Sequence, residues 1–132
     1  MSIATRSIGH PGYSETLARV SESAMVARSL VRVATAAWDL KNLSESCAVV
    51  VTELVANAVQ HAQGNDIRVV VERVKPRTVC VSVSDSSPVS PVLRSPSESV
   101  EGGRGLILVS ALAKDWGTKQ LPGGKEVWAT VQ

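Results

Sequence analysis

Three polar side chains lie four residues apart in the segment 52–62, namely Glu53, Asn57 and His61. The residues between them are mostly apolar, which predicts a helix that stacks the three side chains along one stripe. A carboxylate and a carboxamide one turn apart offer the oxygen ligands that Mg²⁺ prefers while it retains water. Asn is a mediocre helix former, so its presence inside an otherwise strong helix suggests that the side chain of Asn57 binds a ligand. The alternative is the solvated polar face that amphipathic helices normally carry.

Asp85 and a glycine-rich stretch extend this candidate site. Asp85 follows the alternating segment 78–84, and a carboxylate at a strand end can accept a hydrogen bond from an exocyclic amine such as that of adenine. A turn-initiating Asp is the alternative. Gly102-Gly103-Arg104-Gly105 precedes an apolar segment, where free N–H groups at a helix start and the charge of Arg104 could hold an anion. The alternative is a plain glycine-rich helix entry, and neither a P-loop nor a Rossmann fingerprint is present.

Hydrophobic periodicity predicts the elements that position these residues. The predicted elements are an edge strand at 13–19, helices at 22–38, 43–62 and 106–113, and strands at 67–74, 78–84, 115–120 and 126–131. Residues 1–12 are predicted to be a flexible N-terminal tail, and 13–132 a single domain with a Pro- and Ser-rich lid at about 86–102. Hairpin-linked strands with helices between them predict an α+β fold: a two-layer sandwich whose mainly antiparallel sheet is covered on one face by helices.

The composition excludes several classes of function. The chain has 132 residues, of which 44% are hydrophobic and 20% charged, as expected of one globular domain. We expect no membrane span and no signal peptide, and therefore a cytoplasmic location. The net charge is only +2 and the basic residues are scattered, so we expect no direct nucleic-acid binding. Cys47 and Cys80 are expected to be small core residues rather than a disulfide or metal pair.

Three sequence blocks occur in the order of a known superfamily. Glu-Leu-Val-Ala-Asn-Ala-Val-Gln-His-Ala at 53–62, Val-Ser-Asp-Ser-Ser-Pro at 83–88 and Gly-Gly-Arg-Gly-Leu at 102–106 resemble the N, G1 and G2 boxes of the GHKL ATPases, which have the Bergerat fold. The resemblance covers about residues 20–131. Within the superfamily, Ala27-Arg28 and the ending Trp116-Gly117…Gly124-Lys125-Glu126-Val127-Trp128 look most like the anti-sigma-factor serine/threonine kinases.

The resemblance implies ATP and Mg²⁺ as cofactors and a role for each box. Asn57 would hold the Mg²⁺ that bridges the ATP phosphates, Glu53 would be the general base that deprotonates a serine on a protein substrate, and Asp85 would read the adenine amino group. His61 matches the histidine that ends the N box, although a His that caps helix carbonyls is an equal alternative. The phosphate side and the lid would be lined by Gly103, Arg104, Gly105 and Leu106.

The resemblance also implies partners: a sigma factor, an anti-sigma-factor antagonist, and a second copy of the chain in a homodimer. Two departures from the family pattern keep alternatives open. Asp85 is followed by Ser-Ser-Pro instead of the usual x-Gly-x-Gly, and Lys125 stands where the family often has Thr. We therefore consider two main functions, a kinase that phosphorylates a serine on the antagonist and a partner-switch binding module whose shape the nucleotide only tunes. A detached histidine-kinase catalytic domain and a relative that has lost ATP binding are the remaining alternatives.

Overall fold

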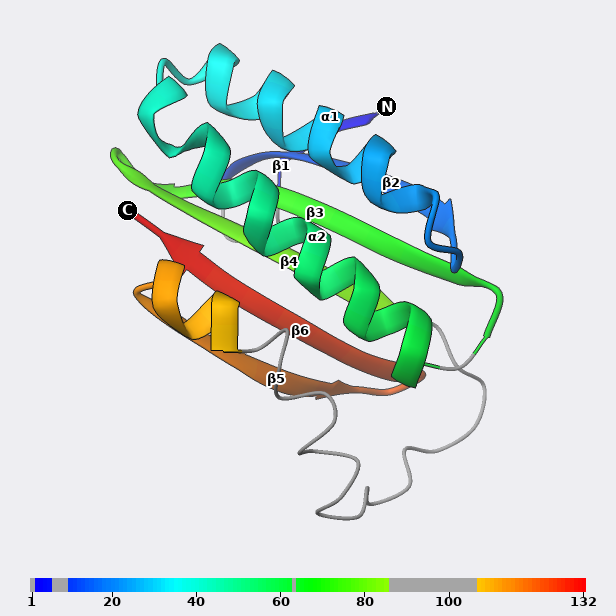
Figure 1. Ribbon diagram of the computed structural model, residues 1–132. Coiled ribbons are helices and arrows are strands. Elements are labelled where there is room, and N and C mark those ends of the chain that lie inside the picture. The colour runs from blue at the N-terminus through cyan, green and yellow to red at the C-terminus, as the bar shows by residue number, and fades with distance from the viewer. Residues whose placement is uncertain (1, 6–9, 63, 86–106) are drawn as a thin grey trace.

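The computed structural model describes residues 2–5, 10–62, 64–85 and 107–132 (Figure 1). In chain order its elements are β1 (Ser2–Thr5), β2 (Pro11–Ala18), α1 (Ser23–Ala37), the 3-10 helix η1 (Lys41–Leu43), α2 (Ser44–His61), β3 (Asp66–Lys75), β4 (Thr78–Asp85), β5 (Asp115–Leu121) and β6 (Gly124–Val131). Residues 107–112 are also helical. The predicted lid at 86–102 and the glycines at 102–105 lie outside the described residues.

The strands form one six-stranded sheet in the order β1-β2-β3-β4-β6-β5, and each neighbouring pair is antiparallel. α1 and α2 lie side by side across one face of this sheet (Figure 1). α1 packs over β2 and β3, while α2 packs over β4 and β6. The predicted α+β sandwich, with a mainly antiparallel sheet and helices on one face, is therefore confirmed.

The core is an aliphatic layer between the helices and the two central strands. Val69 pairs with Val83 and Val71 with Val81, and all four side chains are buried. Because side chains alternate along a strand, this register turns every second valine of β3 and β4 toward the helices. From the helix side the layer receives buried residues of α1 and α2, among them Leu30, Val31, Val50, Leu54 and Val55. The predicted common face of Val79, Val81 and Val83 is thus confirmed.

The N-terminal part of the sheet differs from the sequence prediction. β2 begins at Pro11 and lies between β1 and β3, so the edge position predicted for the strand at 13–19 is wrong. β1 lies inside the segment predicted as a tail, and its Ser2 pairs with Ser14 of β2. A four-residue strand is too short to show alternation, and its pairing is a tertiary contact that the local sequence does not encode. The flexibility predicted for residues 1–12 stays a prediction.

The α1–α2 connection sets the two helices antiparallel. The amide of Leu40 donates to the Thr35 carbonyl at 2.7 Å, and the amide of Asp39 donates to the Ala36 carbonyl at 3.2 Å. These two bonds, with Asp39 at φ 56°, form a Schellman cap that ends α1. η1 then leads directly into α2. Neither helix, nor any other in the described part of the chain, is long and apolar enough to cross a membrane.

The two cysteines occupy different environments. Cys47 is buried in α2 within the core, whereas Cys80 is half-buried on β4, and neither forms a disulfide. Cys47 fits the predicted core role. Cys80 alternates with Val79 and Val81, so it lies on the sheet face opposite the helices. Burial raises the pKa of the Cys47 thiol from 9.0 to about 12, because the apolar core disfavours the thiolate.

This burial predicts a pH dependence of stability. Between about pH 9 and 12 the unfolded chain releases the Cys47 proton while the folded chain keeps it, so the free energy of unfolding falls as pH rises. We expect this thiol to contribute about 1.4 kcal/mol per pH unit to the slope measured by urea unfolding of the wild type. Cys47→Ala lowers stability at pH 7 but flattens this slope. Parallel pH profiles for the wild type and Cys47→Ala would contradict the assignment.

Candidate functional site

Asp85 and the C-terminal turns of α2, which carry Asn57 and His61, lie at one end of the sandwich. Pairing sets Ile67, at the start of β3, opposite Asp85, at the end of β4, and sets Ser84 opposite Glu126 near the start of β6. α2 ends at this same end, because only residues 62–65 separate it from β3. Figure 1 shows the last turn of α2 beside the beginning of β6. One end of the domain therefore carries the C-terminal turns of α2, the end of β4 and the beginning of the last hairpin.

The stripe on α2 is present as predicted. Glu53, Asn57 and His61 all lie within α2, and each side chain is half-buried. Leu54 and Ala58, each one residue further along, are buried in the core. At about 100° per residue, the stripe therefore lies at the margin of the packed face, where side chains are anchored yet still accessible. Such a position suits ligand binding, and it is equally the ordinary place for polar residues of an amphipathic helix.

Asp85 is held against the beginning of β6. The backbone N–H of Lys125 donates to Oδ1 of Asp85 at 3.4 Å. Gly124, which is buried, lies so close that a Cβ at this position would overlap both the carboxylate and the main-chain carbonyl of Asp85. Glycine is therefore required at position 124 for this approach of two backbones. The effect is that backbone groups of the last hairpin help to orient a half-buried carboxylate at the strand end.

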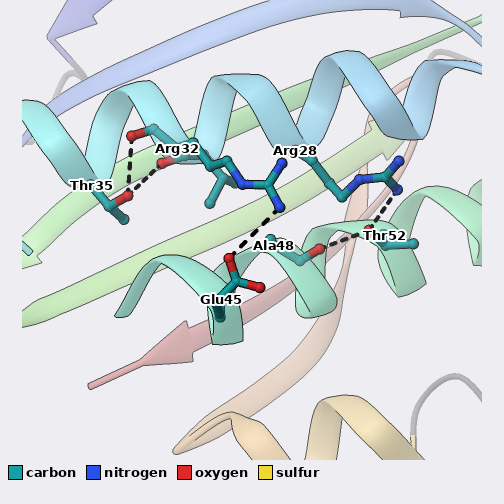
Figure 2. A network of polar contacts seen from close by, with 7 residues as sticks. Arg28, Arg32, Thr35, Glu45, Ala48 and Thr52 are labelled. Atoms are coloured by element: carbon teal, nitrogen blue, oxygen red, sulfur yellow. Dashed lines mark hydrogen bonds and ion pairs between the residues drawn. The ribbon is translucent and has the colours of Figure 1, made fainter. Parts of the chain in front are cut away.

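A groove of about 200 Å³ runs between α1 and α2 on the side of the helices away from the sheet (Figure 2). Nη1 of Arg28 crosses it to the hydroxyl of Thr52 at 3.2 Å, and Nη2 of Arg32 lies 3.7 Å from Oε1 of Glu45. The groove is lined by Arg28, Arg32, Glu45, Ala48, Val49, Thr52 and Glu53. Glu53 therefore borders two surfaces, this groove and the stripe that continues to Asn57.

The described side chains at the site could bind Mg²⁺ only together with further ligands, such as phosphate oxygens and water. Within the described ranges, no group of three or more His, Cys, Asp or Glu side chains could hold a metal ion. The carboxamide oxygen of Asn57 is a suitable single ligand for Mg²⁺, which commonly binds through one or two side chains, phosphate oxygens and retained waters. Gly103, Arg104, Gly105 and Leu106 lie outside the described residues, so their predicted roles at the phosphates stay predictions.

Sequence reasoning missed two residues at this end of the molecule. The role of Gly124 has no local sequence signal, because its close contact with Asp85 joins positions far apart in the chain. Arg19, at the end of β2, reaches the end of α2 and hydrogen-bonds the carbonyl of Val59. A single arginine after a strand gives no local signal of such a contact. The backbone N–H of Lys125, the residue that stands where the family often has Thr, contacts Asp85 beside Gly124.

Comparison with known proteins agrees with this arrangement. A family model described as the histidine kinase-like ATPase domain matches residues 13–131. The chain therefore belongs to the histidine kinase-like ATPase domain family, which confirms the GHKL superfamily and nucleotide binding as the activity of the class. Among curated proteins no significant match was found. The family match does not distinguish the branches of the superfamily.

The contact between Gly124 and Asp85 can be tested directly. Gly124→Ala forces a Cβ into the Asp85 carboxylate, so we expect a loss of stability of about 1–3 kcal/mol and weaker ATP binding. The matched control is Gly123→Ala, because Gly123 is exposed and does not have a positive φ. Calorimetric titration with Mg²⁺-ATP and thermal unfolding measure the two effects. Equal ATP affinity in both variants would show that the position of Asp85 is unimportant for binding.

Proposed function

We propose that the protein is an ATP-binding regulatory protein of the anti-sigma-factor serine/threonine kinase branch, which phosphorylates a serine on an antagonist protein. The observation that carries the proposal is the convergence, at one end of the domain, of α2 bearing Asn57 with Asp85 at the end of β4. Membership of an ATPase family supports ATP as the nucleotide that binds at this end. Glu53, one helical turn before Asn57, supplies a carboxylate that is half-exposed and borders an open groove.

Each residue has a defined part in this reaction. Asp85, oriented by the Lys125 amide, accepts a hydrogen bond from the adenine amino group. Asn57 provides the protein oxygen for Mg²⁺, which would offset the negative charge of the phosphates. Glu53 takes the proton of the substrate serine as the serine oxygen bonds to the γ-phosphorus and the bond from that phosphorus to the oxygen of ADP breaks. Phosphoryl transfer depends mainly on positioning and charge neutralisation, so these few groups suffice.

The kinase proposal predicts a separation of chemistry from binding. With Mg²⁺-ATP and a candidate antagonist, Glu53→Gln should lower the rate of phosphoserine formation by about 10²-fold or more and change ATP affinity little. Asn57→Ala should weaken Mg²⁺-ATP binding itself. Phosphoserine is measured by mass spectrometry and affinity by calorimetry. If the wild type binds ATP yet forms no phosphoserine with any partner, the kinase function is wrong.

A second candidate is a partner-switch binding module, and the outer surface of α1 favours it. Met25, Val26 and Val33 are 68%, 47% and 43% exposed, so α1 presents apolar side chains to solvent. Arg28 lies on the same helix, and within the described residues its side chain has only the Thr52 hydroxyl as a hydrogen-bond partner. Apolar side chains beside an arginine are typical of protein docking surfaces. This surface would take a sigma factor or antagonist, or a second copy of the chain in a homodimer.

The binding module predicts that Arg28 matters for partners and not for ATP. Arg28→Glu should weaken binding of the sigma factor or antagonist by about 30-fold, as for an interface hot spot, and leave Mg²⁺-ATP affinity unchanged. Lys41→Glu, an equal charge change at an exposed position of η1, is the control. Glu53→Gln should retain full sequestration of the partner. Undiminished partner binding by Arg28→Glu would remove α1 from the docking surface.

A further inference from the structure

Arg19 joins the end of β2 to the end of α2. Its Nε donates to the carbonyl of Gly64 at 2.6 Å and its Nη1 donates to the carbonyl of Val59 at 2.8 Å. Its own backbone amide donates to the carbonyl of Asn65 at 2.8 Å. The half-buried guanidinium therefore spans the last turn of α2 and the connection that follows it.

These contacts satisfy backbone groups that a helix end leaves open. The last four carbonyls of an α-helix have no partner within the helix. In α2 the Ala62 amide satisfies the Ala58 carbonyl at 2.9 Å, and Arg19 satisfies the next one, that of Val59. A positive charge at this end also complements the helix dipole. Gly64, at φ 86°, turns the chain so that its own carbonyl reaches the same guanidinium.

The Arg19 side chain binds the backbone close to Asn57, the predicted Mg²⁺ ligand. Val59 follows Asn57 by two residues, and in an α-helix the carbonyl of Asn57 is bonded to the amide of His61. Loss of the last turn would therefore free the backbone of Asn57. Arg19 itself is well anchored, because the adjacent Ala18 pairs with Asp66 of β3 and its carbonyl accepts a 2.6 Å hydrogen bond from the Ser23 hydroxyl.

We propose that Arg19 is a positioning residue of the nucleotide site, which fixes the last turn of α2 so that Asn57 holds Mg²⁺-ATP in a defined geometry. The inference rests on the proposed nucleotide site and adds a residue outside the three sequence boxes. Arg19 touches neither metal nor nucleotide in this scheme, and it acts through the Val59 and Gly64 carbonyls. A merely stabilising cap would lower the melting temperature without a specific effect on Mg²⁺-ATP.

The test compares variants of the full chain. Arg19→Met removes both side-chain hydrogen bonds but keeps a long, unbranched side chain. Arg19→Lys keeps the charge without the planar guanidinium fork. Arg68→Met is the surface control, because Arg68 is exposed on β3 and makes one 3.5 Å contact with the Ser14 hydroxyl. Val131→Ala is the stability control, because it opens the core at the end of β6 remote from Asp85. Mg²⁺-ATP affinity is measured by calorimetry below the melting temperature of every variant.

We expect Arg19→Met to weaken Mg²⁺-ATP binding by about tenfold or more, the range found for residues that orient a metal ligand, with Arg19→Lys in between. Arg68→Met and Val131→Ala should stay within about twofold of the wild type. In the nucleotide-free protein, hydrogen exchange at residues 58–62 should accelerate in Arg19→Met and not in Val131→Ala.

Two results would overturn the inference while the nucleotide site stands: wild-type affinity in Arg19→Met, or an equal loss in Arg19→Met and Val131→Ala. A failure of the proposed site is recognised separately, because the wild type itself would then not bind Mg²⁺-ATP, and the inference would fall with it. Accelerated exchange in Arg19→Met with unchanged affinity would assign Arg19 to stability alone and also overturn the proposal.

Discussion

The burial of α2 against the central strands is the contact on which the rest of the molecule depends. Leu54 and Val55 of α2 belong to the same buried cluster as Val81 and Val83 of β4. This packing fixes the rotation of α2 about its axis, and a shift by one residue, about 100°, would turn Asn57 away from the margin of the core. The position of the polar stripe is thus a consequence of where the apolar side chains lie, and the functional residues inherit their geometry from the core.

The candidate site is assembled from the ends of elements rather than from their middles. Asp85 ends β4, Gly124 begins β6, and Arg19 follows β2. Backbone groups lack regular partners at such ends, so they are available to orient side chains, as the Lys125 amide does for Asp85 and the Val59 carbonyl does for Arg19. Antiparallel pairing brings these ends together, because alternate strands begin where their neighbours finish. The topology therefore explains why residues from distant parts of the chain meet at one end.

The sequence alone predicts the parts of this structure that depend on local patterns. The faces of β4 and α2 follow from alternation and helical periodicity, since the position of each residue within the local repeat decides which face it shares. It does not predict β1, the interior position of β2, or the contacts of Gly124 and Arg19, because those depend on pairing between segments. The ordered boxes indicated the family, which the match to residues 13–131 confirms. The roles of Glu53, Asn57, His61 and Asp85 stay predictions, since their chemistry needs a ligand.

Under the proposed function, α2 is the element that would couple nucleotide to partner. One side of it carries Thr52, which receives Arg28 of α1, and the other side continues through Glu53 to Asn57. A partner bound to Arg28 would act on α2 through Thr52, and a nucleotide bound to Asn57 would act on the same rigid helix from its other side. If either ligand favours one position of α2, the affinity of the other must change by the same factor. Because Arg19 holds the C-terminal turn of α2 to the end of β2, a shift of this rigid helix would be smallest at that turn.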